Sequence, residues 1–229
     1  MDVVALVLFG AVGMTLLALV VLVPVLVVTA QRRAQERRDG LAAFALARDW
    51  ELRPEDPALV GRFRGAPFER GHSRRATNVL LGRHEGREFT AFDYRYVSGS
   101  GEDRHTSTHS VVALNLGVAA PDLAVGPTGT LRRWVDALTG KDIEIGDPTF
   151  DSFFTVHSSS PEFARDLLLS DVREVLRHHP SLSWRITGDS LLVIRPGSHG
   201  PAEVEGLLAA MGALLDRVPA RVWERLGSG

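Results

Sequence analysis

A long apolar segment constrains the fold of this chain more than any other feature of its sequence. Residues 3–30, VVALVLFGAVGMTLLALVVLVPVLVVTA, contain no charged side chain. A helix of about 20 apolar residues crosses a bilayer, and it satisfies its backbone hydrogen bonds without water. The sequence therefore predicts a single transmembrane anchor over residues 1–30, which contacts the lipid bilayer through residues 3–28.

A cleaved signal peptide is the alternative interpretation of this segment, because Val28-Thr29-Ala30 offers small residues to a signal peptidase. The apolar region of a signal peptide spans only about 7–15 residues and follows a basic segment. Met1 and Asp2 provide no basic side chain. We therefore favour an anchor that is retained.

The charges that flank the apolar segment indicate its orientation. Residues 31–40, QRRAQERRDG, hold four arginines and two acidic residues, whereas Asp2 is the only charged residue on the other side. Basic flanks stay in the cytoplasm. We expect a single-pass protein of the cell membrane with its N-terminus outside and its C-terminal domain cytoplasmic. Residues 31–50 are expected to form an Arg-rich juxtamembrane helix.

Composition excludes several classes of protein. The 229 residues include no cysteine, which excludes a disulfide scaffold, an iron–sulfur cluster, a thiolate zinc site and a cysteine nucleophile. The formal net charge of −2 gives no electrostatic reason to expect nucleic acid as a partner.

Residue patterns after the anchor predict an α+β domain over residues 51–229, with a mainly antiparallel sheet and packed helices. Residues 57–76 show no period and are expected to form a loop. The expected strands are 78–97 with a break at 84–86, 106–116, 150–157, and a hairpin of 183–187 and 190–195 around Gly188-Asp189. The expected helices are 131–138, one that begins at Pro161 and ends before Pro180, one that begins at Pro201, and a short turn over 218–226.

Histidine and carboxylate residues do not form a recognisable reactive set. His105 and His109 have the HxxxH spacing, but their surroundings favour a strand, in which residues four apart cannot share one metal ion. Asp147 and Asp151 are typical of turns, and Asp93 lies within a strand pattern. We therefore predict no metal-binding residue.

Nucleophile and nucleotide motifs are also missing from the sequence. Ser158, Ser159 and Ser160 lack a GxSxG setting, and no GxGxxG or P-loop pattern is present. We therefore predict no catalytic residue and no cofactor. Arg70, Arg74 and Arg75 near His72 form a basic patch, interpreted mainly as solvated surface; phosphate, a lipid head group or an acidic partner are the alternatives.

The anchor, the Arg-rich flank, GREFTAFDYRYV (86–97) and DPTFDSFFTVHSSSPEFARDLL (147–168) together resemble uncharacterised single-pass membrane proteins of high-GC Gram-positive bacteria. The resemblance implies a membrane location and carries no assigned activity or catalytic residue.

The hypothesis that follows is a non-enzymatic, membrane-anchored domain of unknown activity that binds or scaffolds an unknown protein partner near the inner leaflet. A membrane-bound, hydrolase-like enzyme using residues such as His109, His157, Asp93 and Asp151 is an alternative, and a lipid-sensing module is another. Gly10, Gly13, Ala11 and Thr15 give a weak indication that two anchors pair in a homodimer.

Overall fold

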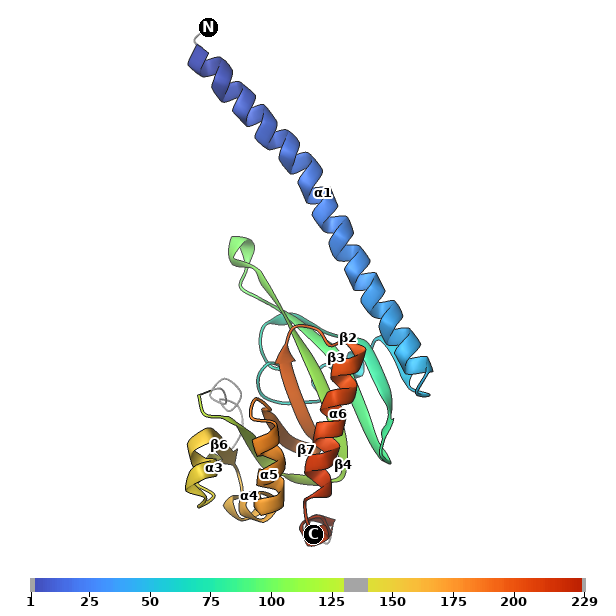
Figure 1. The fold of residues 1–229 in the computed structure, drawn as a ribbon, viewed down its shortest axis with the longest axis vertical. Coiled ribbons are helices and arrows are strands. Elements are labelled where there is room, and N and C mark those ends of the chain that lie inside the picture. The colour runs from blue at the N-terminus through green and yellow to red at the C-terminus, as the bar shows by residue number, and fades with distance from the viewer. Residues whose placement is uncertain (1–2, 130–139, 228–229) are drawn as a thin grey trace. The chain divides into compact units, whose positions relative to one another are not determined.

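The computed structural model describes residues 3–129 and 140–227 of the chain (Figure 1). In its first helix, side chains are described for residue 20 and from residue 22 onward. The chain divides into two compact units, residues 1–43 and 44–229. The predicted helix over 131–138 lies outside the described residues.

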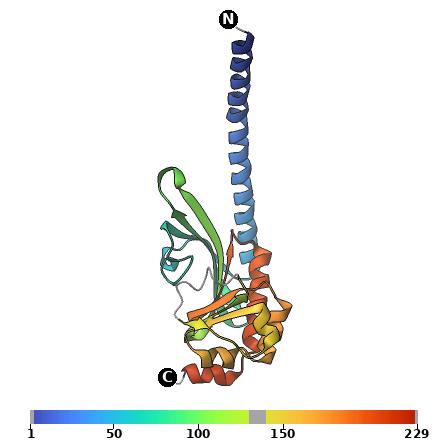
Figure 2. The same ribbon diagram turned by 90° about the vertical axis from the view of Figure 1, so that its left-hand side faces the viewer.

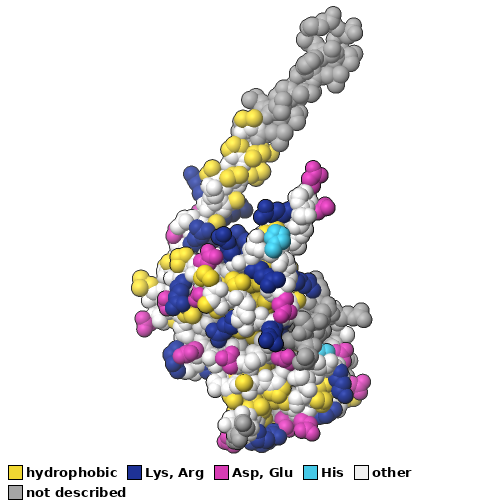
Figure 3. Space-filling view, turned by 180° about the vertical axis from the view of Figure 1, so that it is seen from behind, with side chains coloured by type: hydrophobic (Ala, Val, Ile, Leu, Met, Phe, Trp, Pro, Cys, Tyr) yellow, Lys and Arg dark blue, Asp and Glu magenta, His cyan; other side chains and the backbone are white. Residues whose placement is uncertain are grey.

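The first unit consists of helix α1 (Val3–Leu46) up to residue 43. Among the residues whose side chains are described, no helix is long and apolar enough to cross a membrane. Most side chains of the predicted anchor, those of residues 1–19 and 21, lie outside that part. Figure 3 shows yellow hydrophobic side chains along the described part of α1. Seven of them are 45–68% exposed: Val20, Leu22, Val23, Val25, Leu26, Val27 and Val28.

The second unit is built on an antiparallel sheet, which confirms the α+β fold class. Its strands are β1 (Glu51–Glu55), β2 (His72–His84), β3 (Arg87–Ser98), β4 (His105–Pro127), β5 (Lys141–Asp142), β6 (Phe154–Ser158) and β7 (Trp184–Pro196). The strand order is β1-β2-β3-β4-β6-β5, and β7 also pairs with β4. Strand β4 pairs first with β3 and later with β6, while β7 pairs with both parts of it.

Helices and short 3-10 turns connect and cover the strands. They are η1 (Pro57–Leu59), η2 (Gly101–Asp103), α3 (Pro148–Phe153), α4 (Pro161–Leu167), α5 (Ser170–His178), α6 (Pro201–Asp216) and α7 (Ala220–Gly227). In Figure 2, α5 and α6 lie on one face of the sheet, and the loop of residues 60–71 lies on the other. The predicted helix at Pro201 and the final turn over 218–226 are confirmed.

The hairpin predicted within residues 78–97 is confirmed as β2–β3. Its turn places Glu85 and Gly86 at φ 49° and 81°, the positive values that a tight type I′ turn requires. Strand β2 begins at His72 rather than Asn78, because His72 and Arg75 extend the pairing with β3 past an irregularity in the register. The predicted loop over residues 57–76 is therefore shorter than expected.

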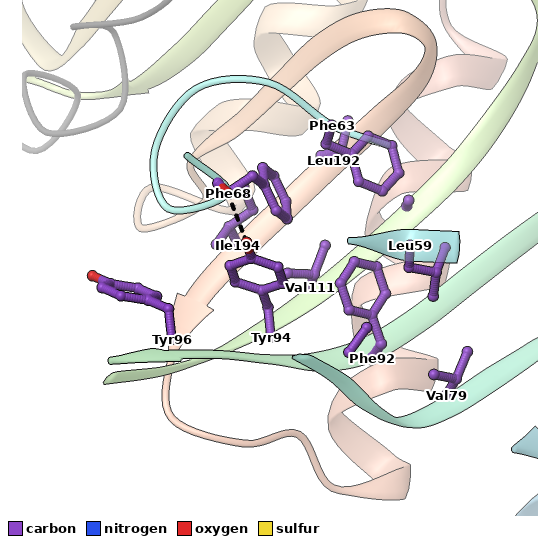
Figure 4. Packing of buried hydrophobic residues seen from close by; sticks show 12 residues of the cluster. Leu59, Phe63, Phe68, Val79, Phe92, Tyr94, Tyr96, Val111, Leu192 and Ile194 are labelled. Atoms are coloured by element: carbon purple, nitrogen blue, oxygen red, sulfur yellow. Dashed lines mark hydrogen bonds between the residues drawn. The ribbon is translucent and has the colours of Figure 1, made fainter. Parts of the chain in front are cut away.

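Both faces of the sheet are buried. On one face, Phe92, Tyr94 and Tyr96 of β3 lie in the core cluster drawn in Figure 4, as the alternation in the sequence predicts. The other members of this cluster are Leu59, Phe63, Phe68, Ala76, Val79, Val111, Ala113, Leu192 and Ile194. The opposite face of the sheet is covered by α6, whose buried residues include the predicted Val204, Leu207, Leu208, Met211 and Leu215.

The hairpin predicted around Gly188-Asp189 is wrong. Strand β7 runs through these residues and pairs with β4 on both sides of them, with Ser190 opposite Asn115 and Ile186 opposite Leu123. The register is irregular at this point, and Gly188 has φ 58°. A glycine and an irregular pairing bend one continuous strand here instead of reversing the chain.

The strand predicted over residues 150–157 is wrong in its first half. Residues 148–153 form α3, because the Asp147 side chain accepts a hydrogen bond from the Phe150 amide and Pro148 occupies the first helical turn. The single helix predicted from Pro161 is divided into α4 and α5 at Leu168 and Leu169, which leave the helical conformation.

Candidate functional site

The loop of residues 60–71 (the 60–71 loop) forms one wall of the candidate site. Its sequence, VGRFRGAPFERG, places two aromatic side chains between glycines and arginines. Phe63 and Phe68 lie 5.3 Å apart and enter the core cluster, where the Phe68 ring meets Tyr94 edge-on at 5.0 Å. These two aromatic side chains hold a segment without regular structure against the sheet.

Buried polar side chains satisfy the carbonyl groups of this loop. The Tyr94 hydroxyl donates to the Phe68 carbonyl at 2.7 Å, as Figure 4 shows. Arg185, at the start of β7, donates to the carbonyls of Ala66 at 3.0 Å and Arg64 at 2.8 Å. Burial lowers the pKa of Arg185 to about 10, so it stays positively charged at neutral pH. Each donor replaces the water that a free loop carbonyl would need.

The last residues of the loop are fixed in the same way. Arg74 donates to the Glu69 carbonyl at 2.7 Å and to the carbonyls of Arg70 and Gly71 at 3.2 Å. Gly71 has φ 60°, and a Cβ atom at this position would collide with the Val97 carbonyl of β3. The backbone at Arg70 is therefore held in place by several contacts.

A cavity of about 290 Å³ (the basic cavity) lies between the 60–71 loop, the ends of β3, β4 and β7, and the connection before β7. Ala66, Pro67 and Ile194 contribute apolar surface. The polar residues that line it are Arg70, Tyr96, His109, Ser181, Ser183 and Arg195. The Arg195 side chain itself lies on the opposite face of the sheet from His109, because Arg195 pairs with Ser110 and contacts Glu203 of α6. Residues from five places in the chain meet here, because β4 places His109 between Tyr94 of β3 and Pro196 of β7.

The basic cavity is positively charged. Arg70 places a positive charge at it, and no acidic residue is among its described lining residues. Arg70 is exposed and forms no ion pair with a described residue. Arg195 contacts Glu203 at 3.4 Å through Nη1, and both side chains are partly exposed. The cavity can therefore attract an anion.

His109 and Tyr96 form the aromatic side of the basic cavity. Their rings are stacked with centroids 5.8 Å apart and an interplanar angle of 11°. Burial lowers the pKa of His109, and the positive charge of Arg70 lowers it further. In Figure 4 the Tyr96 hydroxyl points away from the core cluster. This hydroxyl makes no hydrogen bond to another described residue.

A second cavity, of about 400 Å³, lies beside β1, β2 and β3. Its lining mixes the acidic residues Asp49, Glu51 and Glu88 with Arg62 and Arg83. Arg83 and Glu88 lie 3.5 Å apart and offset each other's charge. This mixture of charges gives the second cavity a weaker electrostatic preference than the basic cavity has.

The structure separates the residues of the predicted basic patch. Arg70 alone lines the basic cavity, whereas Arg74 binds the loop carbonyls. Arg75 points its guanidinium toward Glu55 at 3.8 Å. His72 lies within hydrogen-bonding distance of Ser73 and the Gly99 carbonyl, at 3.2 and 3.4 Å.

The carboxylates considered for catalysis take part in structural contacts. Asp147 caps α3, and Asp151 accepts hydrogen bonds from the amides of Ile145 and Gly146 at 3.1 and 3.0 Å. Asp93 is buried, accepts a hydrogen bond from the Asn78 side chain at 2.7 Å, and lies 3.2 Å from Nδ1 of the buried His199.

The other polar candidates also take part in structural contacts. His157 pairs with Asp142 at 3.0 Å on the exposed β5–β6 edge. His105 and His109 both lie on strand β4, as expected. Ser158 donates to the Asp122 carbonyl at 2.7 Å, and Ser160 caps α4.

Sequence reasoning did not find several of these residues. Ser181 and Ser183 carry no motif, and only the pairing of β7 with β4 brings the end of β7 beside His109. The Asp93–His199 pair joins residues 106 positions apart. The basic patch of Arg70, Arg74 and Arg75 is visible in the sequence, but which of these arginines lines a cavity depends on the fold.

Comparison with known proteins gives one informative likeness. No family model matches the chain, and no curated protein sequence does. The crystal structure of the mycobacterial trehalose monomycolate transport factor A, TtfA, is similar, with a TM-score of 0.57 and 16% sequence identity. The match covers 80% of this chain and 96% of that chain. At this identity the likeness shows a shared fold.

Proposed function

We propose that this chain is a membrane-anchored accessory factor in the transport of a cell-envelope lipid, and that its domain acts by binding a protein partner rather than by catalysis. The fold that it shares with TtfA over 96% of that chain carries this proposal. TtfA is described as a trehalose monomycolate transport factor. The resemblance of the sequence to single-pass membrane proteins of high-GC Gram-positive bacteria agrees with such a role.

The first helix supports the membrane part of the proposal. Its described portion presents seven large apolar side chains between Val20 and Val28 that are 45–68% exposed. A continuous exposed apolar surface of this kind fits lipid. The arginines at positions 32, 33, 37 and 38 follow directly and favour a cytoplasmic position for the domain.

The contacts of the acidic residues support binding rather than catalysis. Asp93, Asp147 and Asp151 each accept hydrogen bonds from neighbouring backbone or amide groups that hold the fold together. His157 is paired with Asp142 at an exposed strand edge. A hydrolase would need such groups to converge on one cavity.

Cysteine labelling tests the anchor and its orientation, because the chain has no native cysteine. Asp2→Cys, Ser100→Cys and Ser228→Cys would be treated with a membrane-impermeant maleimide in intact and in permeabilised cells. We expect Asp2→Cys to react in intact cells and the other two only after permeabilisation. The reverse pattern would overturn the orientation, and release of the chain by alkaline carbonate would overturn the anchor.

Complementation tests the role in transport. Cells that lack the chain are expected to retain an envelope lipid on the inner side of the membrane, as measured by lipid extraction and surface labelling. The full chain should restore export, whereas residues 31–229 without the anchor should not, at matched protein levels. Normal export in the deletion strain would overturn the proposed function.

A further inference from the structure

We propose that the second cavity binds a neutral saccharide unit. Thr90, Asn115 and Ser190 form its floor, and exposed carboxylates and guanidiniums form its rim. This inference goes beyond the proposed transport role and does not depend on it, because it concerns a small ligand of the folded domain.

The floor of the second cavity lies on the sheet face that also holds the core cluster of Figure 4. Side chains alternate between the two faces of a strand, so residues two positions apart share a face. Each floor residue lies two positions from a member of the cluster: Thr90 from Phe92, Asn115 from Ala113, and Ser190 from Leu192. The strand register places Asn115 directly opposite Ser190. The apolar face therefore ends in polar side chains at the place where the cavity lies.

Two floor side chains have hydrogen-bonding groups that the fold does not use. The Thr90 hydroxyl is half-buried and makes no hydrogen bond to a described residue. Asn115 accepts from the Gly117 amide through Oδ1 at 2.6 Å, which leaves its Nδ2 group to donate. Ser190 is buried and donates to the neighbouring Asp189 at 2.7 Å. Thr90 and Asn115 are therefore the floor groups that a ligand can contact.

The rim of the second cavity carries both signs of charge. Its members are Asp49, Glu51, Glu88, Arg62 and Arg83. Glu88 lies 3.5 Å from Arg83, and Glu51 lies 2.6 Å from Arg53. An anion would meet the carboxylates and a cation would meet the guanidiniums, so the rim favours a ligand without net charge.

A saccharide matches this mixture of groups. Each of its hydroxyls both donates and accepts, whereas a carboxylate only accepts and a guanidinium only donates. Neighbouring hydroxyls of one sugar ring can therefore satisfy Glu88, Arg83 and the floor at the same time. Leu81 and Ala113 add apolar surface for the C–H groups of the ring.

Trp50 holds the wall of the second cavity in position before any ligand binds. Its ring meets Phe89 edge-on at 4.6 Å, and its indole donates to the Arg83 carbonyl at 3.3 Å. Gly82 makes room for this ring, because a Cβ atom there would collide with it. A backbone that is fixed beforehand loses less conformational entropy on binding.

The size of the second cavity agrees with a small ligand. Its volume of about 400 Å³ lies within the range for small-molecule sites, about 300–1,000 Å³. The same saccharide chemistry occurs in a soluble sugar and in the head group of a glycolipid. The experiments below separate these two sources.

Binding would be measured with the full chain in nanodiscs of phosphatidylcholine, since sugar-based detergents would compete for the site. Glucose and maltose are the soluble probes, and saturation-transfer difference NMR detects their binding. We expect saturable binding of at least one of them. Glucosamine and glucose 6-phosphate carry a charge on the same ring and should bind no more tightly than glucose. Binding of either charged sugar more than about tenfold tighter would overturn the choice of a neutral ligand.

Nanodiscs that also contain a glucosyl diacylglycerol identify the source of the saccharide. Loss of soluble-sugar binding in these nanodiscs, compared with phosphatidylcholine alone, would support a glycolipid head group as the ligand. Unchanged binding would support a soluble sugar.

Variants of the floor locate the site. Thr90→Val keeps the side-chain shape and should weaken binding about three- to tenfold, the effect of one lost hydrogen bond. Thr108→Val is the matched control, because Thr108 is a half-buried threonine on the opposite face of β4. It should change binding less than about twofold.

Asn115→Asp provides a second test at the floor. It keeps the Oδ1 acceptor for the Gly117 amide and removes the Nδ2 donor, so it should also weaken binding. Unchanged binding in both Thr90→Val and Asn115→Asp would overturn the proposal. Equal losses in Thr90→Val and Thr108→Val would do the same, as would a folded native chain that binds neither glucose nor maltose.

Discussion

At the scale of single residues, buried donors of hydrogen bonds shape the wall of the basic cavity. Tyr94 is fully buried and donates to the Phe68 carbonyl, whereas Tyr96 is two residues away on the same face and turns its hydroxyl outward. Burial raises the pKa of Tyr94, so the hydroxyl keeps its proton well into alkaline solution. The hydroxyl of Tyr94 thus lies in the core, whereas Tyr96 of the same strand lines the cavity.

Replacing Tyr94 by Phe removes this donor and leaves the Phe68 carbonyl buried without it. We expect Tyr94→Phe to lower the free energy of unfolding by about 1–2 kcal/mol, measured by urea titration of the full chain in detergent with circular dichroism. Tyr96→Phe is the matched control and should change it by less than about 0.5 kcal/mol. Equal losses in the two variants would contradict the assigned role of the Tyr94 hydroxyl.

The pKa of His109 is predicted to depend on Arg70. Arg70→Gln should raise this pKa toward its ordinary value of 6.5, because one of the two causes that lower it, the Arg70 charge, is removed while burial remains. A lowered histidine pKa means that the unfolded chain binds protons more readily than the folded chain does. The folded domain therefore loses stability as the pH falls below about 6.5. NMR titration would measure the pKa, and an unchanged value in Arg70→Gln would refute the coupling.

At the scale of elements, local turn chemistry was easier to predict than the pairing of distant segments. The local conformational preferences of Glu85-Gly86 predict a turn, and those of Pro161 and Pro201 predict the first turn of a helix. All three predictions hold. Gly188-Asp189 has the same local character as a hairpin turn. Its neighbours instead pair with β4, and that pairing depends on residues some 70 positions away.

Helix α3 shows how a local signal can be misread. Phe150, Phe153 and Phe154 favour a strand by composition, but Asp147 and Pro148 start a helix just before them. Asp147 also lies 3.1 Å from the guanidiniums of Arg173 and Arg177 on α5. The cap could have been recognised in the sequence, whereas its partners on α5 could not.

Asp147 is predicted to stabilise α3 by its charge as well as by its cap. The hydrogen bond from the Phe150 amide, together with Arg173 and Arg177, lowers the pKa of Asp147. Asp147→Asn keeps a capping oxygen and should lower the melting temperature less than Asp147→Ala does. Because the folded pKa is lowered, the contribution of Asp147 is present above pH 3.8 and is lost as the pH falls through its folded pKa.

Thermal unfolding at neutral and acidic pH would test this prediction. The difference between Asp147→Asn and the native chain should shrink in acid, where the native carboxyl becomes protonated. Thr149→Ala, which changes a nearby exposed residue of the same helix, is the control. A difference that persists unchanged in acid would contradict the charge contribution.

At the scale of the whole molecule, the sequence could predict only which residue types form the candidate site, and not which of them meet in space. The sequence shows an arginine-rich loop before an aromatic strand, yet Arg70 becomes a cavity residue only because β3, β4 and β7 end beside the 60–71 loop. The second compact unit also begins at residue 44, before the domain predicted from residue 51. The residues between these two positions make contacts that pattern alone did not reveal.

Residues 44–50 are predicted to be needed for the stability of the domain. Arg48 binds Glu205 of α6 at 2.7 Å and lies over the Phe44 ring, while the Trp50 ring meets Phe89 of β3 edge-on at 4.6 Å. A fragment of residues 44–229 should therefore unfold cooperatively, and a fragment of residues 51–229 should be less stable by at least about 2 kcal/mol, since it loses two packed aromatic side chains.

Urea titration of both fragments measures the difference. Within residues 44–229, Trp50→Ala should reproduce much of the loss, while Ala47→Ser, a change at an exposed position, should not. Equal stability of the two fragments would show that the domain begins at residue 51 after all.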